Sequence, residues 1–397
     1  MIEIEGKYCT AKVFTNNLNN DVASQIKTLC NQEFTKGRKI RLMPYVNSGE
    51  SCGMGFTADL GDKVIPSIVG DDIGCGVLTV ELGKVNIDLN KLDNVIRENI
   101  PSGVNVHKEI IGMCTDIYNL KVFNKLKDKE RIFRELGTLG GGNHFIELDK
   151  DDEGNYYLII HSGSRNLGKQ VADIYQKIAI NNCRDDYLEK DKKNEKEYEF
   201  EKALLEFKKE HEGLNIKMPK ELCYLSGKHR EDYINDMNIC QSYAEGNRLL
   251  MAMVILRHIL NMGSVDANYF HTVHNYISFK DNIIRKGSIS AYKGEKVLIP
   301  MNMRDGSLLC KGKGNSDWNN SAPHGAGRVM NRNQVKKKYS LDEFRKPMEG
   351  VGTTEVWNET IQECPMEYKS IDEIIDNIGE TVEVVKRLRP VYNFKAK

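Results

Sequence analysis

Short runs of β-branched residues bounded by glycine or proline occur near both ends of the chain, and they limit its possible folds more than any other feature. The N-terminal runs include KVIPSIVG at 63–70 and GVLTVEL at 76–82, and similar runs return at 283–290 and 295–300. The middle of the 397-residue chain has mostly helical periodicity. Because no internal repeat and no low-complexity linker divides the chain, the pattern predicts one α+β domain over 1–397.

Apolar residues recur at three- and four-residue spacing between about 91 and 139, which predicts helical structure there. A second helix is predicted over about 232–260, with Met253 and its neighbours in the core. The other predicted elements are a buried strand at 156–160 that leads into a polar turn, a terminal helix near 371–378 and a closing strand at 389–397.

Glutamate and lysine dominate the segment 185–212, where Phe200, Leu204 and Phe207 form a narrow apolar stripe at helical spacing. Charge runs of this kind are usually solvated faces. We therefore expect a charged helical insertion at about 184–231 within the single domain, rather than a binding arm.

The charge balance and the apolar runs exclude several classes of protein. The chain has 57 Lys and Arg against 57 Asp and Glu, which excludes a globally basic nucleic-acid binder but allows a local basic channel. The longest strongly apolar run, 249–256, is far shorter than the roughly 20 residues that cross a bilayer. The N-terminus lacks the pattern of a secretory signal, and the 10 cysteines form no CxxC pair. We expect a cytoplasmic protein with reduced thiols and no membrane span.

Four of the nine histidines lie beside turn residues or at a strand end: His144, His161, His274 and His324. The other five are interpreted as packed or surface residues, His258 on its helix among them. In VGDDIGCGV, Asp72 and Cys75 lie three residues apart in a glycine-flanked turn. Taken alone, this turn is adequately explained by a buried thiol.

Combined with three of the histidines, the turn can supply a mixed ligand set for one or two divalent metals. Imidazole nitrogen, thiolate sulfur and carboxylate oxygen suit Mn or Zn, and ligand type does not choose between the two. The residues that we assign to this set are Asp72, Cys75, His144, His161 and His274.

Two glycine-rich loops, LGTLGGGNHF at 136–145 and APHGAGR at 322–328, could bring backbone N–H groups close to an anion. Neither matches a P-loop or a Rossmann fingerprint. His324 in the second loop could attack phosphorus, but a metal ligand or a simple loop histidine is equally compatible with the residues. The sequence itself therefore predicts a metal-dependent phosphoryl or nucleotidyl transfer enzyme of undefined substrate.

Seven motifs in order resemble the RtcB family of GTP-dependent RNA ligases, and the chain's ending RPVYNFK resembles that family's lysine-terminated end. The seven are VGDDIGCG, LGTLGGGNHFIE, IHSGSRNLG, HNY, RKGS, SAPHGAGRVMNR and EYKSID. The resemblance extends over nearly the whole chain. It implies a single catalytic domain with β-sheets around a central metal and nucleotide cleft, acting in tRNA splicing or RNA repair.

The resemblance implies that Cys75 bridges two Mn²⁺ ions, that Asp72 and His144 complete one shell, and that His161 and His274 complete the other. It makes His324 the catalytic residue, which becomes a covalent GMP-histidine. The implied GTP-binding residues are Asn143, His144, Phe145, Ile146, Glu147, His274, Asn275, Pro300, Met301, Asn302, Met303, Ser307, His324, Gly325, Ala326, Gly327 and Lys395. Glu147 can accept from the guanine edge or hold a neighbouring donor.

The implied substrate is RNA with a 3′-phosphate or 2′,3′-cyclic phosphate end and a second RNA end with a 5′-hydroxyl. GMP moves from His324 to the 3′-phosphate, giving an RNA(3′)pp(5′)G end, and the 5′-hydroxyl then displaces GMP. Family members often work with an archease-type activator. The basic residues that we expect near RNA phosphates are Arg165, Arg285, Lys286 and Arg328.

The chain departs from the family pattern at three places. Tyr45 and Asn47 replace an acid and a histidine, the 300–303 loop reads PMNM rather than PGSM, and QECP replaces the DE-x-P element. These changes favour a paralogue with a narrowed repair or capping substrate. Alternatives to the ligase are a metal-dependent phosphodiesterase or nuclease, a guanylyl capping enzyme for 3′-phosphate ends, and an RNA-end-binding protein without turnover.

Overall fold

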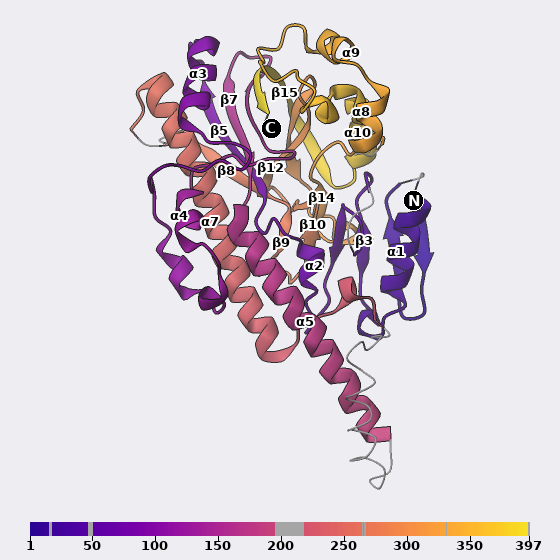
Figure 1. Cartoon of the computed structure of the whole chain (residues 1–397). Helices are drawn as coiled ribbons and strands as arrows, with labels where there is room; N and C mark the ends of the chain where they lie inside the picture. The colour runs from indigo at the N-terminus through magenta and orange to yellow at the C-terminus, as the bar shows by residue number, and fades with distance from the viewer. Residues whose placement is uncertain are drawn as a thin grey trace.

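The computed structural model describes residues 1–15, 18–46, 51–194, 218–263, 265, 267–330 and 332–395. Within these residues the chain forms a strand-rich body with two long helices, α5 (Arg165–Asn194) and α7 (Gly227–Leu260), which pack against each other (Figure 1). The predicted α+β class is confirmed. The stripe that we predicted at 200–207 lies outside the described residues.

A seven-stranded antiparallel sheet includes His161 and His271 on its strands, while His144 directly precedes β6 and His274 directly follows β8. Its strand order is β12-β13-β15-β6-β7-β5-β8, so the last strand in the sequence lies near the middle. The strand bounds are β5 Gly76–Gly83, β6 Phe145–Lys150, β7 Tyr156–Ser162, β8 Tyr269–Val273, β12 Lys296–Asn302, β13 Gly306–Gly312 and β15 Val382–Lys395. Leu298 N on one edge donates to Thr272 Oγ1 on the other at 3.2 Å, so the sheet nearly closes on itself.

The two faces of this sheet meet different surroundings, because successive side chains of a strand point to opposite sides. Ile146 and Leu148 of β6 pack in a core cluster with Met251 and Ala252 of α7. Phe145 instead packs inside the curled sheet, in a cluster with Leu298 and Leu309. Glu147 lies on the same inner face as Phe145.

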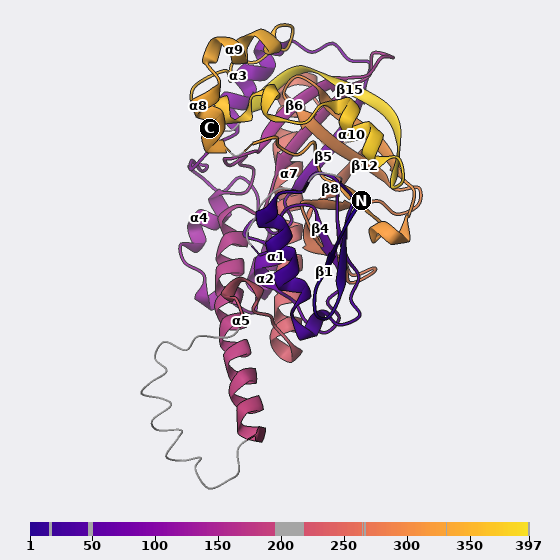
Figure 2. The same ribbon diagram turned by 90° about the vertical axis from the view of Figure 1, so that its right-hand side faces the viewer.

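A six-stranded sheet has the order β1-β2-β3-β4-β10-β9, and a two-stranded sheet pairs β11 with β14. Figure 2 shows α1 alongside β1, where its buried face joins the core of the six-stranded sheet. The strand bounds are β1 Ile2–Glu5, β2 Thr10–Val13, β3 Ile40–Leu42, β4 Phe56–Ala58, β9 Asn275–Ile277, β10 Ile284–Lys286, β11 Ser288–Ser290 and β14 Ser321–Pro323.

The remaining helices are short. Their bounds are α1 Asn20–Cys30, α2 Pro66–Val69, α3 Leu89–Asn99, α4 Lys129–Arg134, α8 Arg332–Lys338, α9 Leu341–Arg345 and α10 Ile371–Ile378. The 3-10 turns are η1 Glu33–Thr35, η2 Thr115–Asn119, η3 Phe123–Lys125, η4 Lys220–Leu222, η5 Ser316–Trp318, η6 Lys346–Met348, η7 Ile361–Glu363 and η8 Pro365–Glu367. In the described part of the chain, no helix combines the length and the apolar character that a membrane crossing requires.

Two of our expectations were wrong. The segment KVIPSIVG forms α2 rather than a strand, because Pro66 at the first helical position fixes φ for a helix and needs no N–H partner. Met253 is 40% exposed, whereas Met251 and Ala252 are buried, so the core stripe of α7 passes beside Met253. In addition, α1 interrupts the predicted run of N-terminal strands.

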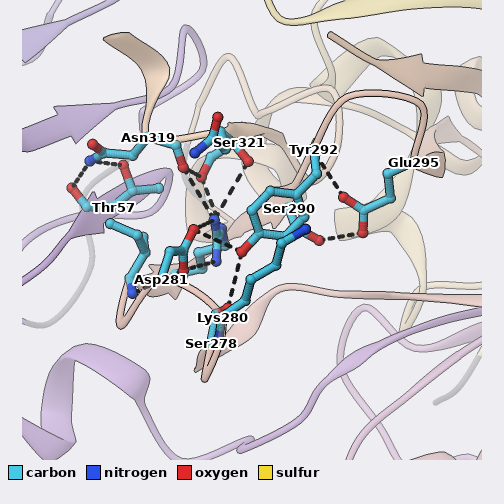
Figure 3. A network of polar contacts seen from close by, with 12 residues as sticks. Thr57, Ser278, Lys280, Asp281, Ser290, Tyr292, Glu295, Asn319 and Ser321 are labelled. Carbon is cyan, nitrogen blue, oxygen red and sulfur yellow. Dashed lines mark hydrogen bonds and ion pairs between the residues drawn. The ribbon is translucent and has the colours of Figure 1, made fainter. Parts of the chain in front are cut away.

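A buried polar network joins β10 to the strand that precedes the His324 loop. The Arg285 side chain is fully buried and donates to Asp281 Oδ2 at 3.0 Å and to Ser321 Oγ at 2.9 Å. Figure 3 shows Asp281 and Ser321 on either side of this network, with Tyr292, which donates to Asp281 at 2.7 Å. The network fixes β14, whose last residue is followed by His324.

Candidate metal centre and nucleotide site

Cys75, His144 and His161 lie together at one end of the seven-stranded sheet. The Cys75 Sγ atom lies 3.5 Å from His144 Nε2 and 3.4 Å from His161 Nε2. All three residues are buried, and their candidate ligand atoms lie within 4.8 Å of one another. Cys75 precedes β5, His144 precedes β6 and His161 belongs to β7, so the antiparallel register of these neighbouring strands brings the three together.

Asp72 joins this cluster through His144, whose Nε2 lies 3.0 Å from the Asp72 carboxylate. Burial would raise the pKa of Asp72, but the hydrogen bond and charge of His144 lower it to about 2. Burial and the Asp72 charge raise the pKa of the Cys75 thiol well above its ordinary value. A divalent cation at this position would stabilise the thiolate, because coordination deprotonates thiols.

The tautomer of His144 also fits a metal ligand. Its Nδ1 atom lies 2.8 Å from the Leu139 carbonyl, which can accept only if Nδ1 carries the proton. With Nδ1 held in this way, Nε2 faces Cys75 and Asp72: it donates to Asp72 while it carries a proton, and it offers a lone pair to a metal ion once that proton is lost. A second ring nitrogen held by a backbone carbonyl is the usual arrangement for a metal-binding histidine.

His274 and His324 extend the cluster. The ring centroids of His161 and His274 are 5.1 Å apart, and those of His274 and His324 are 4.7 Å apart. Burial and neighbouring imidazoles lower the pKa of His161 and His274 well below the ordinary value. Burial also lowers the pKa of His324 to about 4, against the effect of a hydrogen bond with the Gly287 backbone. All four histidines singled out from the sequence therefore gather in one place, and the lowered pKa values favour neutral imidazoles at His161, His274 and His324.

Phe145, Glu147 and Lys395 line the inner face next to the histidines. The Phe145 ring centroid lies 5.4 Å from that of His161, and Lys395 Nζ lies 5.3 Å above Phe145. Lys395 Nζ also donates to the backbone carbonyl of the exposed residue Asn143 at 3.0 Å. Ile146 lies on the opposite face in the hydrophobic core, so the structure does not bring its side chain to the site.

Glu147 is 2% exposed and accepts a hydrogen bond from Asn393 Nδ2 at 2.6 Å. Burial raises the pKa of Glu147 to about 7, although Asp149, Asn393 and Lys395 each oppose the shift. Ser307 is fully buried on β13. These residues form a polar layer inside the sheet beyond the histidines.

The segment 300–303, which we expected to be a loop, instead forms the end of β12 and the first residue of the following turn, and it contributes mainly packing. Met301 and Met303 are buried in two different core clusters, and Asn302 accepts from Arg304 N and donates to Asp305 at 2.8 Å. The Pro300 carbonyl approaches the His324 loop, where a Cβ on Gly325 would lie 3.2 Å from it, and Met301 shares a core cluster with Ala326.

The residues after His324 are close to other backbone. Ala326 is buried in the core. Gly327 has φ of 70°, and a Cβ there would lie 2.6 Å from the Tyr45 Cβ. Asn275 accepts from Gly287 N at 3.2 Å and donates to the Asp72 carbonyl at 3.3 Å, so it ties the metal-ligand turn to the β10–β11 connection.

The basic residues expected near RNA are largely engaged within the protein. Arg285 is fully buried, as described above, and Lys286 is 7% exposed and donates to the Ser67 carbonyl at 2.9 Å. Arg165 donates to Gly103 O at 3.2 Å. Arg328 contacts Glu363 at 3.3 Å. Each of these four basic groups is therefore already engaged by other parts of the protein.

Three important residues escaped the sequence analysis. Asn247 and Arg248 of α7 are fully buried, and Arg248 Nη1 donates to the carbonyls of Gly74 at 3.0 Å and Ser162 at 2.8 Å. Glu363 is 1% exposed and binds Lys395 at 3.2 Å. Asn247 and Arg248 could have been found as a polar pair within the apolar stripe of a helix, because buried polar side chains usually have hydrogen-bond partners.

A family model described as tRNA-splicing ligase RtcB matches residues 112–396. The chain is 26% identical to the RNA-splicing ligase RtcB of Escherichia coli strain K12, and the match covers 89% of each chain. It is 26% identical to the tRNA-splicing ligase RtcB of Nanoarchaeum equitans, over 83% of this chain and 81% of the relative. It is 23% identical to the tRNA-splicing ligase RtcB of Methanococcus maripaludis, over 97% and 94%.

Proposed function

This chain belongs to the RtcB family, and from that premise we propose that it is an RNA ligase that joins 3′-phosphate or 2′,3′-cyclic phosphate ends to 5′-hydroxyl ends. GTP is the proposed co-substrate and two Mn²⁺ ions are the proposed cofactors. The observation that carries the proposal is the position of His324, a half-buried imidazole beside the Cys75, His144 and His161 cluster.

The low pKa of His324 supports its role as a nucleophile, because an imidazole attacks phosphorus only through an unprotonated nitrogen. We propose that this nitrogen attacks the α-phosphorus of GTP, with loss of pyrophosphate, and later passes GMP to the RNA 3′-phosphate. Asp72, Cys75, His144, His161 and His274 would hold the metal ions, which supply charge neutralisation for the phosphates. Lys395 and Glu147 are the proposed contacts to the nucleotide.

The test is transfer of label from α-labelled GTP to the purified chain in the presence of Mn²⁺. We expect a labelled band that is lost in acid and survives alkali, as a histidine phosphoramidate does, and that is absent from His324→Ala. The matched control is His258→Ala, because His258 is exposed on α7 and its ring contacts the Val254 carbonyl of the same helix. Labelling of His324→Ala at the wild-type level would refute the assignment.

RNA assays separate the ligase from its alternatives. The ligase predicts that His324→Ala loses sealing of 3′-phosphate and 5′-hydroxyl ends. A phosphodiesterase predicts that the same variant still cleaves RNA, and a capping enzyme predicts that RNA(3′)pp(5′)G accumulates without sealing. If wild-type protein takes up no label, the assay is repeated with an archease-type activator, and failure there too would overturn the proposal.

A further inference from the structure

Two carboxyl groups lie side by side in the polar layer beyond the histidines. Glu147 and Asp149 are two residues apart on β6 and therefore share its inner face. They are 2% and 0% exposed. Desolvation and mutual repulsion penalise a second charge when two carboxyls are buried on one face of a strand, so one of the pair is expected to hold a proton.

The surroundings of the pair decide which carboxyl is protonated. Burial and the nearby Glu147 raise the pKa of Asp149 well above its ordinary value. Glu147 has favourable neighbours that Asp149 lacks, namely the Asn393 amide and the Lys395 ammonium group. Tyr157, the register partner of Asp149 on β7, directs its hydroxyl to Asp151, and Lys386 also pairs with Asp151. These neighbours favour the proton on Asp149 and the charge on Glu147.

Several buried atoms around the pair have no hydrogen-bond partner within the described residues. They are both carboxylate oxygens of Asp149, Ser307 Oγ and Asn393 Oδ1. Buried polar atoms without partners are rare in native proteins, and a group of them in one place indicates that a polar ligand or a small adjustment completes the bonds. The nearest polar neighbours of Asp149 are Glu147 and Ser307.

We propose that Asp149 is a positioning residue for Glu147, to which it donates a hydrogen bond inside the sheet. Asn393 holds Glu147 from β15, and Asp149 holds it from β6. A carboxylate has about four lone-pair sites, so Glu147 can accept from both protein donors and still accept N–H groups from a ligand. The ligand class that this arrangement fits is a purine with N–H donors on its edge, of which guanine is one. The inference rests on the proposed function, because it assigns Glu147 to nucleotide recognition.

The geometry also settles a question that the sequence left open. The two roles considered for Glu147 are compatible: it holds the Asn393 amide, and its remaining lone pairs are those proposed for guanine. Recognition of the base then depends on the remaining lone pairs, whose direction is set by Asn393 and Asp149 together.

The experiment measures GTP dependence and pH dependence of His324 labelling in Asp149→Asn and Asp149→Leu. The amide of Asn can still donate to Glu147, whereas Leu cannot. We expect Asp149→Leu to raise the KM for GTP by about 10- to 100-fold with little change in rate at saturating GTP, the range for a hydrogen bond to a charged group. Asp149→Asn should stay within about threefold of wild type on the same reasoning.

The pH profile separates positioning from a merely structural role. Without the Asp149 donor the pKa of Glu147 rises further, so the KM of Asp149→Leu should fall as pH increases above 7, while the wild-type KM changes less. A structural role would lower the folded fraction without changing the KM or its pH profile. The matched control is Asp152→Asn, whose side chain is 75% exposed in the turn after β6.

The outcomes are distinguishable from failure of the proposed function. Unlabelled wild-type protein overturns the function, whereas labelled wild type with an unchanged KM in Asp149→Leu overturns the inference alone. An Asp149→Asn variant as weak as Asp149→Leu also overturns it. If Asp149→Leu does not fold, Asn393→Val provides the test from β15, and an unchanged KM for GTP in that variant contradicts the proposal.

Discussion

Asn247 on α7 clamps the two segments that carry His144 and His161, and its replacement by alanine should be strongly destabilising. Its Oδ1 accepts from the backbone N–H groups of Gly137 at 2.7 Å and Thr138 at 3.0 Å. Its Nδ2 donates to Thr138 O at 3.0 Å, Ser162 Oγ at 3.1 Å and Gly163 O at 3.3 Å. One side chain thus satisfies both the glycine-rich loop and the end of β7.

The expected magnitude follows from the groups that Asn247→Ala would leave unpaired. A buried polar group without a partner costs about 1–3 kcal/mol, so the two backbone N–H groups alone account for about 2–6 kcal/mol. Removal of the side chain adds a small cavity. We expect the free energy of unfolding to fall by about 3–5 kcal/mol, at the upper end of single substitutions.

Urea denaturation followed by circular dichroism measures the change, with Asn238→Ala as the matched control. Asn238 lies on the same helix, is only half-buried and is contacted by Gln241 at 3.3 Å. We expect the control to stay within about 0.5 kcal/mol of wild type. A loss below about 1 kcal/mol in Asn247→Ala, or a loss equal to that of the control, would refute the reasoning about unpaired amides.

Two further predictions concern the metal ligands and acid stability. A Cβ on Gly163 would overlap the Asp72 carboxylate. Gly163→Ala should therefore weaken Mn²⁺ binding by about 10- to 100-fold in titration calorimetry while the fold survives. Gly246→Ala, where a Cβ meets open space, should leave Mn²⁺ binding unchanged. Burial raises the pKa of Asp151, but hydrogen bonds from Asn155 and Lys386 hold it well below its ordinary value, so its stabilisation is present above about pH 4 and is lost as pH falls further. The difference in unfolding free energy between wild type and Asp151→Asn should therefore shrink from pH 6 to pH 3, and a constant difference, or an equal trend in the exposed Asp152→Asn, would contradict this account.

Local sequence signals predicted those parts of the fold whose partners lie within a few residues. The terminal helix was predicted at 371–378 and α10 spans Ile371–Ile378, because Ser370 caps its start and the apolar spacing is helical throughout. In KVIPSIVG the apolar run suggested a strand, whereas Pro66 at the first helical position and packing against α5 and β10 together favour the short helix α2. Short apolar runs do not distinguish a strand from a buried helical turn.

The candidate site was predictable where chemistry is visible in residue type, and unpredictable where it depends on pairing between distant segments. The four histidines stood out because each borders a turn or a strand end. Glu147 and Asn393 became neighbours only through the pairing of β6 with β15, which no local pattern encodes. The same limit applies to Asn247, whose partners are about a hundred residues away in sequence.

The position of β15 in the seven-stranded sheet determines when a newly made chain can acquire its site. β15 pairs with β13 on one side and β6 on the other, so its backbone pairing joins the β12–β13 hairpin to the strands that border Cys75, His144 and His161. Because β6 must wait for a partner more than two hundred residues later, the sheet has many contacts between distant segments and should close slowly. On the ribosome, the metal-ligand strands emerge long before β15, and their open edge is then a target for aggregation or for protective chaperones until synthesis reaches the last strand.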